Sequence, residues 1–277
     1  MCYLCKSKTF QFIFSIMELS LSGKRAIVCG STQGIGKASA LELAMLGADI
    51  TLVARDEQKL KQVVNELSYE KRQQHDYVVA DFRFPEQLKS SIGQYASGKN
   101  VHILVNNTGG PPGGPALSAS VDEFTNAFTS HLLCNQILVQ AVVPGMKREN
   151  YGRIINIIST SVKIPIRGLG VSNTIRGAVA NWSKTLSVEL GPFGITVNNV
   201  LPGASMTGRL ESLIRDRAEK MKKTIEQVTR EMIAEIPAGR ISSSAEVAAA
   251  VAFLATPAAG YINGINLPVD GGRTGAL

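Results

Sequence analysis

The sequence predicts an α/β fold with one doubly wound parallel sheet of about seven strands, and two observations lead to that prediction. First, short and nearly continuous apolar runs recur along the chain, as expected for strands that are covered on both faces. Second, longer segments with helical spacing separate these runs, which favours right-handed crossover connections. The expected strands are Arg25–Cys29, Ile50–Val53, Tyr77–Ala80, His102–Val105, Ile154–Ile158, Thr196–Val200 and Ile265–Val269.

The segment after the first expected strand has the spacing of an amphipathic helix. Ile35, Ala38, Leu41 and Met45 fall on one stripe, which we expect to face the core. Gly47 follows as a stop signal, because glycine adopts the left-handed conformation that ends many helices. Ligands of such sheets bind at the carboxyl ends of the strands, so functional residues are expected just after each strand.

Length and composition fit one globular domain. The chain has 277 residues, of which 44% are hydrophobic and 18% charged, and no linker or internal repeat divides it. The formal charge is +7, but lysines and arginines are scattered among acids, so a solvated surface is favoured over a nucleic-acid site. Free cysteines fit a reducing cytoplasm, and Cys2 and Cys5 lack the further ligands of a metal site.

Residues 1–16 differ from the rest of the chain. We expect them to be an N-terminal appendage or a misassigned start, with Met17 opening the domain of residues 17–277. The apolar run Phe10–Met17 is too short to span a bilayer, and no later segment approaches that length without charge. No membrane association is therefore expected.

A glycine-rich turn, Gly30–Gly36, follows the first expected strand. Its glycines stand at relative positions 1, 5 and 7. Glycine lets the backbone approach a pyrophosphate closely, and the next helix presents its N-terminus to the negative charge. This G-x-x-x-G-x-G spacing resembles that of the short-chain dehydrogenase/reductase family.

Further stretches resemble that family in the same order, each after an expected strand. They are Asp81, Asn106–Gly109, Pro202–Gly203 and Asp270–Gly272. The resemblance spans residues 19 to 273 and points to 3-oxoacyl-[acyl-carrier-protein] reductase-like members. It implies a single-domain Rossmann fold with a nicotinamide dinucleotide. The cofactor-binding residues it implies are Gly30, Ser31, Thr32, Gly34, Ile35, Gly36, Arg55, Asp81, Phe82, Asn107, Gly109, Arg176, Pro202 and Gly203.

The end of the second expected strand indicates which dinucleotide is preferred. Enzymes that prefer NAD(H) place an acid here for the ribose hydroxyls. Ala54 stands in that place and Arg55 follows it, and a guanidinium pairs well with a phosphate. The sequence therefore predicts NADP(H) in preference to NAD(H).

The catalytic positions implied by the resemblance are altered. Ser159 matches the family's serine, but Ser172 stands in place of the tyrosine and Arg176 in place of the lysine four residues later. His131 stands where an asparagine is usual. A serine hydroxyl is a far weaker acid than a phenol, and arginine does not relay protons.

Two other side chains are candidates for supplying the missing proton. Lys163 lies four residues beyond Ser159, and His131 titrates near physiological pH when unperturbed. The competing interpretations are a solvated lysine and a structural histidine. We expect Lys163 to donate the proton, with Ser159 orienting the substrate oxygen and Arg176 anchoring the ribose.

Three functions fit these residues. The first is an NADP(H)-dependent oxidoreductase that reduces a carbonyl or 3-oxoacyl substrate with a non-standard proton donor. The second is a catalytically inactive nucleotide-binding homologue that serves as a sensor or partner subunit. The third is a non-redox lyase or a dehalogenase-like activity. The retained Ser159 favours the first, and the missing tyrosine favours the second.

The remaining expectations concern the pocket rim and partners. The glycine- and proline-rich loop of residues 109–115 either shapes the rim or is a plain surface loop. Residues 208–237 are expected to form a substrate lid. Its basic residues either meet an acidic carrier protein or are simply solvated: Arg215, Arg217, Lys220, Lys222 and Lys223. Family members usually pair into homodimers or homotetramers, and the apolar face Ile137, Leu138, Ala141 and Val142 fits burial there or in the core.

Overall fold

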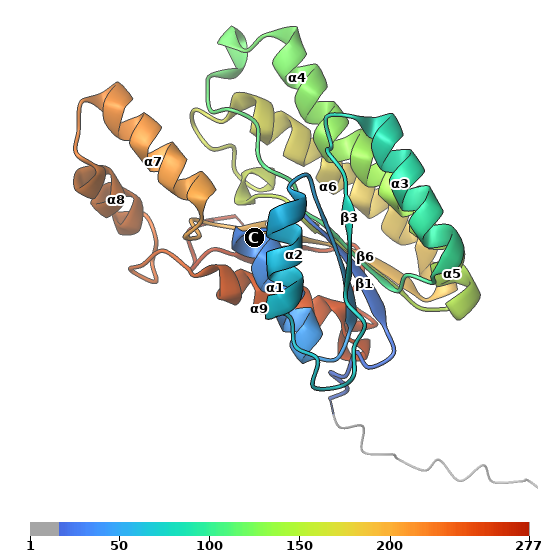
Figure 1. Ribbon diagram of the computed structural model, residues 1–277. Coiled ribbons are helices and arrows are strands. Elements are labelled where there is room, and N and C mark those ends of the chain that lie inside the picture. Colours follow the sequence, from blue (N-terminus) through green and yellow to red (C-terminus); the bar gives the residue numbers. More distant parts are fainter. Residues whose placement is uncertain (1–16, 277) are drawn as a thin grey trace, which may run out of the picture.

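The computed structural model describes residues 17–276 and contains the expected parallel sheet (Figure 1). The strand order is β3-β2-β1-β4-β5-β6-β7, and every pairing is parallel. The chain direction across the sheet reverses between β1 and β4, which makes that point the topological switch. The strands are β1 Arg25–Cys29, β2 Asp49–Ala54, β3 Asp76–Val79, β4 Ile103–Asn106, β5 Gly152–Ile157, β6 Ile195–Pro202 and β7 Asn266–Val269.

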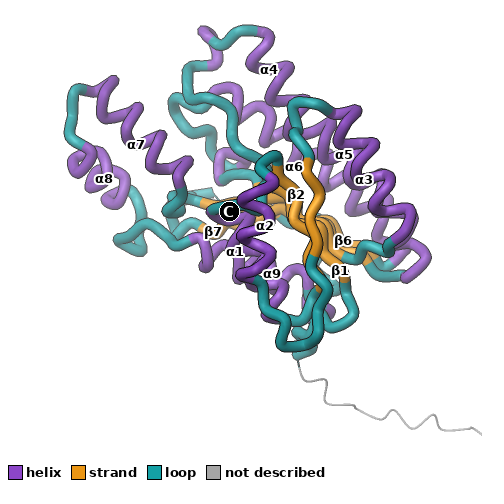
Figure 2. Tube along the Cα trace, viewed as in Figure 1, coloured by secondary structure: helices purple, strands orange, loops and turns teal. Residues whose placement is uncertain are grey.

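Helices cover both faces of this sheet (Figure 2). One apolar cluster joins the sheet to α1, α2 and α9, and a second joins it to α3, α5 and α6. The helices are α1 Gly34–Met45, α2 Glu57–Glu66, α3 Pro85–Gly98, α4 Val121–Phe128, α5 Cys134–Glu149, α6 Gly170–Leu190, α7 Gly208–Met221, α8 Ile225–Ala234 and α9 Ser244–Ala255. Figure 1 shows α7 and α8 as a pair that stands beside the rest of the domain.

All seven predicted strands are confirmed, but the predicted buried stripe of α1 is wrong. Met45 is 58% exposed, and Ile35 and Leu41 are only partly buried. The buried face contains small residues instead, because α1 packs closely against α9. Its members are Gly36, Ser39, Ala40, Leu43 and Ala44. Gly47 ends the helix as predicted, with a φ of 104°.

The structure also bears on the expectations for the cysteines, for membrane-spanning helices and for the apolar face of α5. Cys29 and Cys134 are free and buried, whereas Cys2 and Cys5 and the expectation for residues 1–16 lie outside the described residues. Among the helices of residues 17–276, none is both long and apolar enough to cross a membrane. On α5, Leu138 and Val142 are buried in the domain's own core. Burial of that face therefore needs no partner subunit, and oligomerisation stays a prediction.

A row of asparagine side chains crosses the carboxyl half of the sheet. Asn106, Asn156, Asn199 and Asn266 stand at matching register positions on β4, β5, β6 and β7. Each amide donates to the next or accepts from it, over distances of 2.8, 3.0 and 2.8 Å. We call these four residues the asparagine ladder. It fixes the relative position of the strand ends from which the cleft is built.

We expect Asn156→Ala to destabilise the domain by about 2–4 kcal/mol, because the change leaves buried amide groups of two neighbouring rungs without partners. Urea unfolding followed by the fluorescence of the single tryptophan, Trp182, measures the effect. The matched control is Asn65→Ala on the exposed face of α2, which should change stability by less than about 0.5 kcal/mol. Equal unfolding midpoints for the two variants would contradict a structural role for the ladder.

Candidate active site

A large cleft opens at the carboxyl ends of the strands. Its volume is about 1350 Å³, more than the roughly 300–1,000 Å³ typical of a site for one small ligand. The turns after the first six strands and the helix pair α7–α8 contribute its walls. The cleft therefore has room for an extended dinucleotide and a second molecule.

The glycine-rich turn forms one wall of this cleft. Gly30 and Gly34 have φ angles of 59° and 56°, in the left-handed region that favours glycine. A Cβ on Gly36 would lie 2.2 Å from the Gly30 carbonyl oxygen. Asn107 closes the turn, because its Nδ2 donates to the carbonyls of Cys29 and Gly30, each over 3.2 Å.

Two predicted residues of this turn do not reach the cleft surface. Ser31 is fully buried, with its hydroxyl 3.5 Å from the Val53 carbonyl oxygen. Gly36 is buried against Gly30 and Asn107, so it acts by allowing close packing. The other residues predicted to bind the cofactor all line the cleft.

The ends of β2 and β3 form the far part of the cleft, where Arg55 and Phe82 contribute to the wall. Asp81 lies beside them, and Arg83 binds its carboxylate through contacts of 3.1, 2.9 and 2.6 Å. These bonds from Arg83 hold the pKa of Asp81 below its usual value. The sequence analysis did not predict Arg83, although an arginine two residues after Asp81 is a signal for an ion pair with it. Two guanidinium groups thus meet at this end of the cleft.

Three of the predicted catalytic residues meet at the other end. Ser159, Ser172 and Arg176 all line the cleft. The Ser159 Oγ accepts a hydrogen bond from the Ser161 backbone N–H over 3.1 Å, which fixes the oxygen and leaves its hydrogen available to donate. The Arg176 guanidinium is 8% exposed and donates from Nη1 to the Ile157 carbonyl over 3.1 Å.

His131 lies behind this wall, in a π-helical turn that joins α4 to α5. Such turns are rare and often occur at functional sites. The side chain is 2% exposed, and its Nδ1 contacts the Thr108 hydroxyl. Burial, together with the nearby Arg176 charge, lowers the pKa of His131 to about 2. A pKa this low leaves the His131 ring neutral at physiological pH, which counts against His131 as the proton donor.

Lys163 follows the short 3₁₀ turn that begins after Ser159. It is half-buried, and Thr160, three residues before it, and Ile164, directly after it, line the cleft. Lys163 itself is not among the lining residues. Its role as proton donor stays a prediction.

A tyrosine–lysine pair with the family spacing occurs elsewhere, at Tyr95 and Lys99. The Tyr95 hydroxyl contacts Thr51, and Lys99 pairs with Asp76 at 2.9 Å. Asp76 begins β3, so this pair belongs to the opposite edge of the sheet from the cleft. It does not replace the missing catalytic pair.

The glycine- and proline-rich loop shapes the cleft rim, as one of the two interpretations predicted. Gly114 forms a β-bridge with Leu169 and so ties the loop to the segment before α6. Arg209, at the start of α7, donates to the Pro111 carbonyl. These two contacts join the loop to the segment before α6 and to α7.

The expected lid segment forms α7 and α8, which pack on each other around a small apolar cluster. Its role as a substrate lid stays a prediction. Lys223 pairs with Glu231 at 2.5 Å within this segment.

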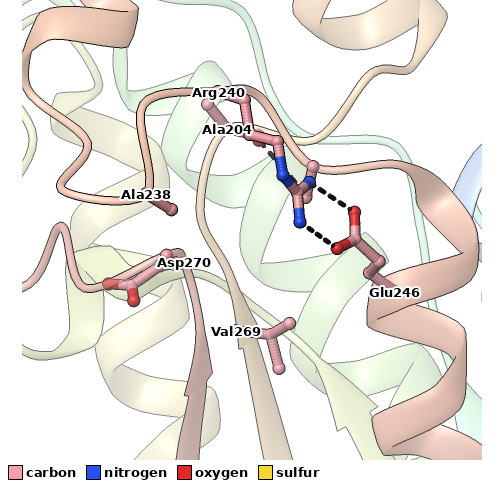
Figure 3. Close-up of a pocket in the computed structure, with 8 residues that line it drawn as sticks. Ala204, Ala238, Arg240, Glu246, Val269 and Asp270 are labelled. Atoms are coloured by element: carbon pink, nitrogen blue, oxygen red, sulfur yellow. Dashed lines mark hydrogen bonds and ion pairs between the residues drawn. The ribbon is translucent and has the colours of Figure 1, made fainter.

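A second pocket, of only about 80 Å³, lies between β7 and α9 (Figure 3). Arg240 and Glu246 close that pocket with contacts of 2.5 and 2.8 Å, so it is a packing gap rather than a second site. Within residues 17–276 no cluster of metal-binding side chains occurs.

A doubly wound sheet whose glycine-rich turn opens on a cleft at the switch point defines a dinucleotide-binding Rossmann domain. Comparison with known families agrees, because the family model described as enoyl-(acyl carrier protein) reductase matches residues 30–274. An uncharacterized oxidoreductase of Mycobacterium tuberculosis is 32% identical, over 92% of this chain and 93% of its own. The chain belongs to the short-chain dehydrogenase/reductase family.

Two further relatives have named activities. The 3-oxoacyl-[acyl-carrier-protein] reductase of Vibrio cholerae is 32% identical, over 92% of this chain and 98% of its own length. The L-sorbose reductase of Gluconobacter frateurii, solved with NADPH and L-sorbose, is 28% identical. It superposes with a TM-score of 0.87 and covers 94% of this chain and 100% of its own.

We expect the His131 ring to stay neutral when folded protein is taken from pH 8 to pH 5, as measured by the ring-nitrogen chemical shifts. His131→Asn identifies the signal. Between pH 6.5 and the folded pKa of about 2, only the unfolded chain binds a proton at this residue. Its contribution to stability is therefore present above pH 6.5 and is lost as the pH falls, by at most about 1.4 kcal/mol per pH unit. A ring that titrates near pH 6.5 would contradict the assignment.

Proposed function

We propose that this protein is an NADPH-dependent reductase of a carbonyl or 3-oxoacyl substrate. The observation that supports the proposal is a single cleft with a glycine-rich turn at one side and Ser159, Ser172 and Arg176 at another. The NADPH-bound L-sorbose reductase with the same fold supports the choice of cofactor and reaction class.

The residues present fit an anionic dinucleotide. The Gln33 side chain does not cap α1, and the first turn of α1 carries no acidic residue. The first backbone N–H groups of the helix are therefore left for a phosphate. At the other end, Ala54 replaces the acid that favours NAD(H), and Arg55 and Arg83 supply positive charge.

When bound, NADPH supplies the hydride, and the residues of this chain position the carbonyl and complete its reduction. The Ser159 hydroxyl donates a hydrogen bond to the carbonyl oxygen, and Ser172 flanks it. Once the hydride has added to the carbonyl carbon, the oxygen carries a negative charge. Arg176 stabilises that charge and does not supply the proton.

The proton that completes the reduction comes, in this proposal, from Lys163. Its position one short turn beyond Ser159 and directly before Ile164, which lines the cleft, supports this assignment. The neutral, buried His131 has no acidic proton to offer at physiological pH. The product is an alcohol, and the lysine regains its proton from solvent.

For cofactor choice, we expect NADPH to bind more tightly than NADH, and Arg55→Ala to lose at least tenfold in NADPH affinity with little change for NADH. The guanidinium would pair with the additional phosphate of NADPH. Isothermal titration of both cofactors measures the difference. Lys61→Ala, on the exposed side of α2, is the matched control. Equal affinities in the wild type would refute the preference.

For the proton, we expect Lys163→Met to lose at least tenfold in kcat, about 1.4 kcal/mol of barrier, with NADPH affinity nearly unchanged. NADPH absorbance is followed with a panel of ketones and 3-oxoacyl thioesters, and Lys89→Met on the exposed face of α3 is the control. Full turnover by Lys163→Met would remove Lys163 from the mechanism. Tight NADPH binding without turnover of any substrate would instead favour the inactive nucleotide-binding homologue.

A further inference from the structure

Two arginines line the cleft that contains Ser159. Arg176 comes from α6, and Arg209 comes from the first turn of α7 in the lid. They approach from different elements, and Arg209 is close enough to help depress the pKa of Arg176. A pair of like charges in one partly buried place is costly unless an anion joins it.

The charge on Arg176 is not neutralised by the protein. The residue is more than nine-tenths buried, and its hydrogen bond to the Ile157 carbonyl goes to a neutral acceptor. In the part of the chain that the structure describes, no carboxylate forms an ion pair with Arg176. Burial lowers its pKa to about 10, which leaves it charged at physiological pH.

Arg209 is half-buried, and its bond to the Pro111 carbonyl is also to a neutral acceptor. The loop lies against it, since a Cβ added to Gly110 would be in ordinary van der Waals contact with the Arg209 Nε, at 3.6 Å. Asp216, on the exposed side of α7, raises the Arg209 pKa, but burial still lowers it overall.

The balance of charge over the whole cleft also favours an anionic ligand. Eight basic and three acidic side chains line it. Two of the acids are already paired, Asp81 with Arg83 and Glu235 with Arg273. In the proposed function the glycine-rich turn and Arg55 bind the phosphates of the dinucleotide, and Arg176 faces the substrate oxygen. Arg176 and Arg209 are therefore the arginines left for a charged group on the substrate.

We propose that the reducible substrate is an oxo acid, whose carboxylate is bound between Arg176 and Arg209 while its carbonyl lies at Ser159. The proposal rests on the reductase function and narrows its substrate class. A guanidinium presents two parallel donors that match a carboxylate, and two guanidiniums from different walls hold it in a defined orientation. Arg209 is thus a specificity-determining residue, and the lid that carries it closes over the substrate's charged end.

The test compares 2-oxohexanoate and 3-oxohexanoate with their methyl esters, which keep the carbonyl and remove the charge. We expect the wild type to prefer an acid over its ester by at least tenfold in kcat/KM. Arg209→Gln should remove that preference. It should lower kcat/KM for the acid, while kcat/KM for the ester stays within twofold of the wild-type value. Arg209→Lys should retain part of it, and Arg215→Gln, on the same helix but outside the cleft, should match the wild type.

A binding measurement separates this proposal from the reductase function. Calorimetric titration of 2-hydroxyhexanoate and its methyl ester into the protein saturated with NADP⁺ should show the same preference and the same loss in Arg209→Gln. If no substrate turns over but the acid binds through Arg209, the reductase function fails and the anion site stands. Equal use of acid and ester by the wild type would overturn the anion site alone. The anion site would also be overturned if Arg209→Gln bound NADPH at least tenfold more weakly, because Arg209 would then bind the cofactor.

Discussion

The site depends on the hydrogen bonds that the side-chain amide of Asn107 donates to the carbonyls of Cys29 and Gly30. One nitrogen donates to the last residue of β1 and to the first residue of the glycine-rich turn, and so joins the two strands on either side of the topological switch. The packing at this point leaves no room for a side chain, since a Cβ on Gly30 would lie 2.6 Å from the Asn107 carbonyl oxygen. The position of the turn, the direction of α1 and the floor of the cleft all follow from this contact.

The fold was predictable because strands covered on both faces leave unbroken apolar runs that a reader can find in the sequence. The buried face of α1 was not, because Ser39 and Ala40 face the core while Met45 faces outward. A helix that packs closely on a neighbour selects small residues, and a pattern of large apolar residues cannot show that choice. The asparagine ladder was equally hidden, since an isolated amide inside an apolar run gives no sign of its partners.

For the site, the strand-end motifs predicted which residues line the cleft. Sequence position alone did not predict the electrostatics. A histidine titrates near neutrality in the unfolded chain, and burial of His131 next to Arg176 lowers its pKa far below that range. Arg83 and Arg209 were missed for a related reason, because each is defined by a contact made in the folded state: with Asp81 for one and with the Pro111 carbonyl for the other.

The separate apolar cluster of α7 and α8 has a consequence for dynamics. Because this cluster is separate from those that cover the sheet, we expect the helix pair to open as one cooperative unit with little disturbance of the sheet's packing. The contact between Arg209 and Pro111 is one of the attachments that this unit makes across the cleft. We therefore expect the rate at which ligands enter and leave to depend on the motion of this helix pair, so that a very stable sheet need not slow that exchange.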